Sequence, residues 1–449
     1  MTIPTGERSL HKVQMGEELT EGSPVNATYV FPAESASIIA LDRAALTPEE
    51  DYGELAGSQP GRSSFGVRQA TLPLRSVVRF EDLIRILQSA LHGGVSPTNP
   101  SSGVYVWTFT ADNADDTLVA KTIEEGDNKV VYRMPGALVQ RLRLSFDALA
   151  PGAAAPWNLE ATFLGRDKTV LPGGFSAATA PVGMETAMGH LTRLFYGPTA
   201  TAFASLAELA KTLLACDLTI ETGVTLRKQG GQGDTADSHG RGRVKVTFSI
   251  LLEQIAGART ALWDVFESDA GNPVIPDRRM RIKIGGGDLD TDEIVTVALT
   301  GDPDGGDFTL TFGGDETPAI AFDAAAAQVQ AALAVLPSIG PGNVQVEGDD
   351  GGPWTVRFIN DLGDTDVGEI TFDDTGLTGG TDPSLLVTVA QEGHAAVARS
   401  IVIDGRAEID SLPVQEGAGS TRYSIQGRFV KDAILASVVQ IAVTNGVSA

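Results

Sequence analysis

The chain has 449 residues, of which 42% are hydrophobic, and a formal net charge of −25 at pH 7. This length allows about two to four domains with ample core. The single cysteine, Cys216, excludes an intramolecular disulfide framework and a multi-cysteine zinc site. No apolar run approaches the roughly 20 residues of a membrane span, and the first residues lack the apolar core of a signal peptide. We therefore expect a protein made in the cytoplasm, without a membrane segment. The 51 glycines and 23 prolines favour a turn-rich, mainly β chain.

The negative charge is concentrated in residues 285–396. This stretch holds 21 acidic residues and one basic residue, Arg357, whereas the rest of the chain is close to balance. A sharp change of this kind indicates a separate module that is solvated on all sides and is a poor partner for nucleic acid.

The chain begins with an extended arm, residues 1–34, which is followed by a strand-like stretch at 35–41. The polar segment 47–71 is too long for an ordinary connection. Residues 80–94 predict a helix, because apolar residues recur on one face from Phe80 to Leu91 and two glycines follow.

The remainder outside the acidic stretch has two halves of similar layout, each with strands around one helix. The second helix is predicted at 255–268. Alternating apolar residues, such as Val246, Phe248 and Ile250, are typical of half-buried strands. The predicted strands are 104–110, 117–125, 129–134, 139–146, 158–166, 213–229, 243–253, 278–284, 400–409, 422–430 and 437–445.

The acidic stretch has its own pattern, which predicts a small sandwich-like domain with one helix. The helix is expected at 323–337, with Asp323 as N-cap and Pro337 as the stop. The predicted strands are 294–299, 307–312, 343–346, 354–359, 369–372 and 385–389.

The acidic module is expected to be an insertion in a host domain. Without it, the strand at 278–284 would run on into the strand-like stretch at 398–417, and both have mixed charge. Insertions are tolerated at exposed tips where the two chain ends lie close together. We therefore expect a host at 35–284 and 397–449 and an insert at 285–396, with Gly285, Asp288 and Gly393 marking the boundary.

The chemical candidates are weak. "DLDTDE" (288–293) has alternating aspartates, but Glu293 and Leu299 stand where an EF-hand needs glycine and glutamate, so that motif fails. A looser calcium site stays open. The glycine-rich loop 228–242 lacks the ending of a phosphate-binding loop. The five histidines are expected to be surface or turn residues, and Cys216 and the four tryptophans to be core. We expect no enzyme activity, metal or cofactor.

Two resemblances carry the functional hypothesis. Within the acidic stretch, "LAVLPSIGPGNVQV", "GGPWTVRF" and "DDTGLTGG" resemble a module of actinobacterial phage structural proteins and of some bacterial surface proteins. The host resembles the major tail tube proteins of long-tailed phages. Much of that likeness lies in "KVQMGEELTEGSPVNAT", which places on the family's opening pattern Lys12, Gln14, Gly16, Glu18, Thr20, Gly22, Val25, Ala27 and Thr28.

The tail tube resemblance implies a mainly β structural protein of the virion tail, with a sandwich or barrel host. Its subunits would form rings, usually hexameric, that stack into a tube through which DNA passes without specific binding. The arm residues from Lys12 to Thr28 would then contribute ring and inter-ring contacts. The implied partners are further copies of the chain and the tape measure, terminator and distal tail proteins. The insert would project outward. The alternative is a carbohydrate- or calcium-dependent surface-adhesion protein.

Overall fold

The computed structural model describes most of the chain. The described residues are 11–34, 37–46, 64–94, 96–101, 103–111, 118–149, 155–181, 184–209, 213–228, 234–253, 277–289, 292–394, 396–416 and 421–447. The predicted helix at 255–268, residues 47–63 of the polar segment, and Asp290 lie outside the described residues. The mainly β fold is confirmed.

The chain forms two compact units. Unit 1 comprises Met1–Pro97, Trp107–Gly286 and Ser400–Thr444, and unit 2 comprises Thr98–Val106, Gly287–Arg399 and Asn445–Ala449. Unit 2 thus contains nearly all of the acidic stretch, together with two short segments from elsewhere in the chain.

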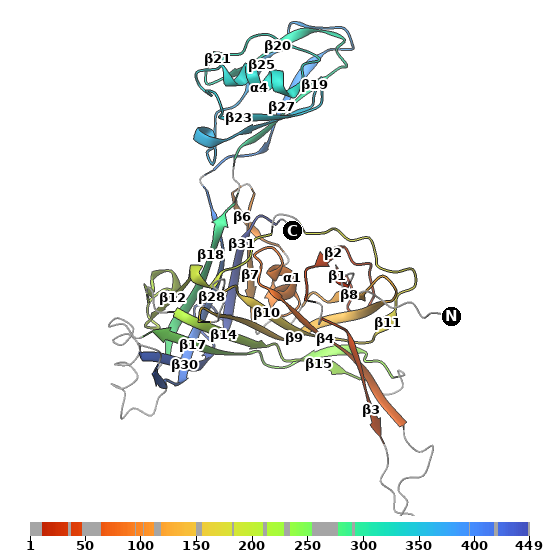
Figure 1. The fold of residues 1–449 in the computed structure, drawn as a ribbon, viewed down its shortest axis with the longest axis vertical. Helices are drawn as coiled ribbons and strands as arrows, with labels where there is room; N and C mark the ends of the chain where they lie inside the picture. The colour runs from red at the N-terminus through yellow and green to blue at the C-terminus, as the bar shows by residue number, and fades with distance from the viewer. Residues whose placement is uncertain are drawn as a thin grey trace, which may run out of the picture. The chain divides into compact units, whose positions relative to one another are not determined.

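Unit 1 is built on a continuous antiparallel sheet (Figure 1). Its central strands pair in the order β4 (Ser64–Val77), β10 (Asn158–Gly165), β9 (Val131–Asp147), β14 (Leu213–Glu221), β17 (Lys245–Glu253) and β30 (Thr421–Val430). Along each strand, successive side chains point to opposite faces of the sheet. In β17, Val246, Phe248 and Ile250 are buried as predicted.

The other strands of unit 1 belong to this sheet, except β15 and β16, which form a separate two-stranded sheet. They are β1 (Lys12–Glu17), β2 (Tyr29–Phe31), β3 (Ala40–Leu46), β5 (His92–Gly93), β7 (Val104–Thr110, at the junction with unit 2), β8 (Lys121–Gly126), β11 (Thr169–Val170), β12 (Thr192–Gly197), β13 (Ala207–Glu208), β15 (Val224–Arg227), β16 (Ser238–Arg241), β18 (Asp277–Asp288), β28 (Ala398–Ser411), β29 (Val414–Glu416) and β31 (Val439–Asn445).

The first helix is shorter than predicted: α1 covers Leu83–Gln88 instead of 80–94. The predicted apolar face is nevertheless buried, from Phe80 to Leu91. The helix ends early because the chain turns at Ser89, whose hydroxyl donates to the carbonyl of Val119 at 2.7 Å. His92 and Gly93 then pair with β7 instead of continuing the helix.

Unit 2 has two sheets around one apolar core. Four strands pair in the order β23, β24, β19 and β27, and β20 pairs with β21, β22, β25 and β26. The ring centroids of Phe308 in β20 and Trp354 in β24 lie 5.6 Å apart, so both sheets contribute to the same core. The bounds are β6 (Thr98–Ser101), β19 (Ile294–Thr300), β20 (Gly305–Phe312), β21 (Asp315–Glu316), β22 (Ile320–Ala321), α4 (Ala326–Ala334), β23 (Val344–Gly348), β24 (Trp354–Phe358), β25 (Thr371–Asp373), β26 (Leu377–Thr378) and β27 (Ser384–Gln391).

The helix of unit 2 lies where the sequence predicts it, but its start differs. Ala325 occupies the N-cap position, and the side chain of Gln328 accepts a hydrogen bond from the Ala325 amide at 2.9 Å. The prediction of Asp323 as N-cap is therefore wrong. Val329 and Leu333 are buried against the core as expected.

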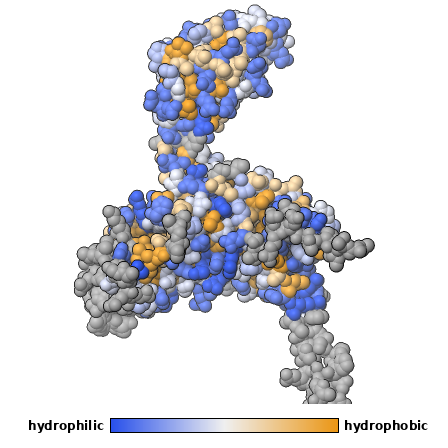
Figure 2. All heavy atoms as spheres, in the orientation of Figure 1, coloured by the Kyte–Doolittle hydropathy of each residue, from blue (hydrophilic) through white to orange (hydrophobic). Residues whose placement is uncertain are grey.

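The surface of unit 2 is mixed in character. Figure 2 shows hydrophobic side chains scattered among hydrophilic ones on the visible face of this unit. The exposed large hydrophobic residues of unit 2 are Val335, Phe372, Leu386 and Val389. Single exposed apolar residues are normal on a soluble protein.

The chain enters and leaves the main segment of unit 2 at neighbouring points. The amide of Leu289 donates to the carbonyl of Val397 at 2.8 Å. The side chain of Arg399 donates to the carbonyl of Asp288 at 2.9 Å. At the predicted boundary, a side chain at Gly393 would collide with the carbonyl of Thr365, so the chain can pass there only as glycine.

Candidate functional site

The N-terminal residues that carry the resemblance fold onto their own chain. β1 pairs along its whole length with β8, and its other edge pairs with β2. Lys12, Gln14 and Gly16 therefore belong to a strand inside a sheet, and Gln14 is almost fully buried. The Lys12 ammonium lies 4.3 Å from the centre of the Phe175 ring.

Glycine at position 16 has a packing reason. A side-chain carbon there would lie 2.5 Å from the carbonyl oxygen of Asn26, inside the loop that joins β1 to β2. Val25 packs at the same point, and its amide donates to the hydroxyl of Thr122 at 3.0 Å. The spacing of Gly16 and Val25 thus serves close contact between the two sides of this loop.

The side chain of Glu18 holds the loop between β1 and β2 in place. Its carboxylate accepts hydrogen bonds from the Gly22 amide at 2.6 Å, the Thr122 hydroxyl at 2.6 Å and the Gly136 amide at 2.8 Å. Two of these donors lie on β8 and β9, so one buried side chain ties the loop to the sheet. Gly22 has a φ of +81°, and a side chain there would collide with Arg166.

Glu21 provides a second attachment. Its carboxylate lies 2.7 Å from the guanidinium of Arg166 and 2.6 Å from Nδ1 of His239 in β16. The hydrogen bond from His239, together with Arg166, lowers the pKa of Glu21 to about 2 against the opposing effect of burial. His239, expected to be a surface or turn residue, has a side chain only 4% exposed. That expectation is wrong because Glu21 and the carbonyl of Leu164 enclose the ring.

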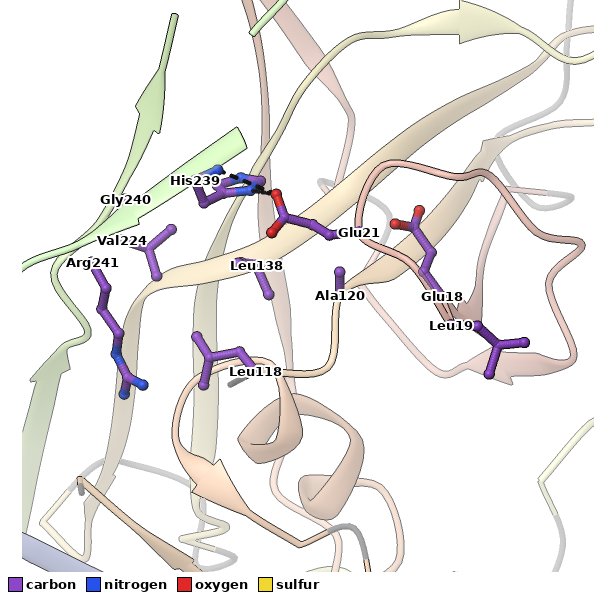
Figure 3. A pocket seen from close by; sticks show the side chains of 10 residues that line it. All are labelled: Glu18, Leu19, Glu21, Leu118, Ala120, Leu138, Val224, His239, Gly240 and Arg241. Carbon is purple, nitrogen blue, oxygen red and sulfur yellow. Dashed lines mark hydrogen bonds and ion pairs between the residues drawn. The ribbon is translucent and has the colours of Figure 1, made fainter. Parts of the chain in front are cut away.

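A pocket of about 340 Å³ lies between this loop and β16 (Figure 3). Leu118, Ala120, Leu138 and Val224 form its apolar floor. The polar lining comes from Glu18, Glu21, His239 and Arg241. Leu19 stands at the rim and is fully exposed.

The predicted contact residues therefore divide into two groups. The side chains of Gln14 and Glu18 are buried within the subunit and shape the arm, whereas Thr20 and Thr28 are exposed. The amide of Thr28 donates to the carbonyl of Met15 within the β1–β2 pair. Sequence reasoning missed Leu19, Arg166 and His239, since the latter two are brought to the arm by strands far away in the chain.

The outer face of the unit 1 sheet carries a row of paired charges. Glu160 in β10 lies opposite Arg75 in β4 and Arg143 in β9, at 3.7 and 3.2 Å. Arg143 also donates to Asp217 in β14 at 2.8 Å. Further along the sheet, Arg428 in β30 contacts two carboxylates of β28. These exposed arginines thus have carboxylate partners on neighbouring strands.

Among the described acidic residues at the start of unit 2, Asp292 and Glu293 have different partners. Asp292 pairs with Arg357 at 3.0 Å. Glu293 instead lies with Asp366 and Glu392, and carboxylate oxygens of the three lie within 4.8 Å of one another. The amide of Val367 donates to Glu293 at 2.8 Å. Burial, reinforced by the two neighbouring carboxylates, raises the pKa of Glu293.

Part of the chain is similar to a phage tail protein. The chain is 43% identical over 119 residues to a tail sheath protein of Mycobacterium phage Bxz1. The match covers 26% of this chain and only 20% of that protein. No description of a known protein family matches the chain. Within the described residues, no helix has both the length and the apolar character needed to cross a membrane.

Proposed function

We propose that the protein is a structural subunit of a phage tail, and specifically of its tail tube. The observation that carries the assignment to a phage tail is the identity with a tail sheath protein of a mycobacteriophage. In this proposal the subunits form rings, expected to be hexameric, and the rings stack into the tube of the virion.

We infer that the part shared with the sheath protein is unit 2. The match of 119 residues is similar in length to Gly287–Arg399, the main segment of unit 2. Unit 2 has its own sheets and core, as expected of a module that occurs in different proteins. The sheath function of the relative would then reside in its unmatched part, and the function of this chain would depend on unit 1.

For unit 1, the tube assignment is supported by the arm and by the outer sheet face. The arm residues of the resemblance form a compact, hydrogen-bonded element around Glu18. The face of the β4–β30 sheet that carries the paired charges is polar, and we propose that this face lines the channel of the tube. Binding of DNA requires lysines and arginines that are available to phosphates. Arg75, Arg143 and Arg428 already contact carboxylates, so such a wall would let DNA pass without holding it.

The proposed partners follow from this position in the tail. Further copies of the chain form the tube, and the tape measure, terminator and distal tail proteins meet its lumen and its ends. Unit 2 projects outward, where its excess of acidic residues keeps it solvated.

The alternative function in surface adhesion has weaker support. A sugar-binding platform needs an exposed aromatic ring, whereas Trp354 is fully buried and its indole N–H donates to the carbonyl of Ala324 at 3.2 Å. The Glu293 carboxylate, the buried member of the acidic group, already accepts a backbone hydrogen bond.

Negative-stain electron microscopy tests the proposal. The purified protein and the virions that contain it should show stacked rings, and an antibody raised against residues 292–394 should label the outside of the virion tail tube. A protein that stays monomeric at high concentration and is absent from virion tails would overturn it. Antibody labelling of a contractile outer layer around a separate tube would favour a sheath subunit instead.

A further inference from the structure

The side chain of Leu19 is exposed to solvent, although the residues on either side of it are held in place. Its side chain is fully exposed, at 102% of the reference area. The residues on either side are not free to move, because Glu18 accepts three hydrogen bonds and Glu21 is held by Arg166 and His239. A large apolar side chain at the tip of a clamped loop has little conformational entropy to lose on binding, which favours a role as an anchor.

The floor of the neighbouring pocket is apolar and so could receive an apolar side chain such as that of Leu19. Its floor is apolar and is formed by Leu118, Ala120, Leu138 and Val224, which belong to one small hydrophobic cluster. Its volume of about 340 Å³ leaves room for a leucine side chain. Figure 3 shows the side chain of Leu19 directed away from Leu118 and Leu138, so the loop does not fill the pocket of its own subunit.

We propose that Leu19 of one copy inserts into this pocket of a second copy. This inference rests on the proposed function, in which copies of the chain assemble with one another. Each copy offers both the anchor and the pocket, so the occupant need not come from another protein. The nearby Glu17 carboxylate is already paired with Lys121 of its own chain at 2.6 Å, so we assign the contact to the apolar side chain of Leu19 and the apolar floor of the pocket.

The proposed contact joins two different surfaces of identical subunits. Such a contact is heterologous, and it repeats from copy to copy until a ring closes or a filament forms. It therefore suits a protein that assembles into rings or stacks, and it gives the arm a specific role: the buried residues fix the loop, and Leu19 makes the contact.

Disulfide trapping between two separately purified variants tests the inference. Leu19→Cys supplies the anchor and Val224→Cys the pocket floor, and neither variant alone can form the trapped pair. On mixing and mild oxidation under assembly conditions, we expect a covalent dimer, since the two residues would be in contact. Native Cys216 is buried and serves as an internal background. If Val224→Cys loosens the floor, Leu118→Cys is the second pocket variant. Ile434→Cys, also exposed at 66%, replaces Leu19→Cys in the matched control and should give no dimer.

Leu19→Asp should weaken self-association about 10-fold or more, and Ile434→Asp should not, as measured by sedimentation velocity. Wild-type rings without any mixed disulfide from either pocket variant would overturn the inference and leave the proposed function standing. Trapping of Leu19→Cys with itself would show a symmetric contact and would also overturn it. Wild-type protein that forms no assembly would instead contradict the proposed function.

Discussion

The two units of the protein are both built from antiparallel strands, but they differ in charge: unit 1 pairs opposite charges across its strands, and unit 2 has an excess of negative charge. In unit 1, arginines and carboxylates meet across neighbouring strands, as Arg143 does with Glu160 and Asp217. In unit 2, carboxylates far outnumber the two arginines, Arg357 and Arg399. An exposed ion pair contributes at most about 1 kcal/mol. The ion pairs of unit 1 therefore affect the electrostatic potential of its surface more than its stability. The excess negative charge of unit 2 favours solubility and repels other acidic surfaces.

The largest test of this comparison removes unit 2. Replacing residues 289–397 by a two-residue Asn-Gly turn should leave unit 1 folded, because the flanking strands β18 and β28 pair with each other. Electron microscopy should show tubes that assemble but lack projections. Loss of folding, seen as aggregation and loss of the circular dichroism spectrum, would contradict the division into two independent units.

A core substitution should affect unit 2 alone. Trp354→Ala removes a fully buried ring and should destabilise this unit by about 3–5 kcal/mol. Differential scanning calorimetry should show one transition shifted and the other unchanged. Leu386→Ala, at an exposed position of the same unit, should change stability by less than about 0.5 kcal/mol. Glycan binding lost in a folded Trp354→Ala variant would instead support the adhesion alternative.

The equivalent test in unit 1 concerns a buried polar group. Glu18→Gln replaces one carboxylate oxygen by an NH₂ group that faces hydrogen-bond donors, at a cost of about 1–3 kcal/mol. We expect faster amide hydrogen exchange in β1 and β2 and little change in unit 2. Thr20→Ala, two residues away and exposed, is the matched control. Equal exchange in both variants would show that the Glu18 hydrogen bonds do not hold the arm.

The acid response should separate the units further. The pKa of Glu21 is lowered to about 2 from 4.5, so its interactions stabilise the fold above the unfolded-state pKa and are lost as the pH falls toward 2. Glu21→Gln should therefore reduce the stability difference between pH 6 and pH 2.5 in unit 1. Glu208→Gln, at an exposed glutamate of unit 1, provides the control. An unchanged difference in Glu21→Gln would show that Arg166 and His239 do not stabilise its charged form.

Glu293 should respond in the opposite direction and more weakly. Its pKa is raised in the folded protein, so its charged form costs stability above the folded pKa, and this cost disappears as the pH falls below the unfolded value. Glu293→Gln should slightly stabilise unit 2 at pH 7 and reduce its gain on acidification. The same thermal scans with added calcium test the acidic group: a calcium-dependent rise in wild-type protein, absent from Glu293→Gln, would show a metal site where we expect none.

Strands were accessible from the sequence because their signals are local, and the module boundaries stay a prediction made from a signal of the same kind. Alternation in β17 and the charge change near residue 285 both appear within short windows, and each has a direct physical cause. The pattern from Lys12 to Thr28 led to the predicted contact residues, and these stay a prediction. The pattern did not indicate that Glu18 and Glu21 attach this segment to distant strands.

The rest could not be predicted because it depends on partners far apart in the chain. Glu21 meets His239 across 218 residues, and Glu18 meets Gly136 across 118. Such pairs depend on the register of strands that the sequence does not specify by itself. Likewise, nothing in the sequence around Ser89 indicates that its hydroxyl donates to the distant carbonyl of Val119 and that the helix ends there.

The hydrogen bond between Leu289 and Val397 has a consequence for how this protein can change. Because the chain leaves unit 1 and returns to it at neighbouring points, a single recombination event can add or remove the main segment of unit 2 without rerouting any other strand. The same position can accept a foreign domain whose termini are equally close. The junction is thus an attachment point for a displayed domain, in one copy for every chain.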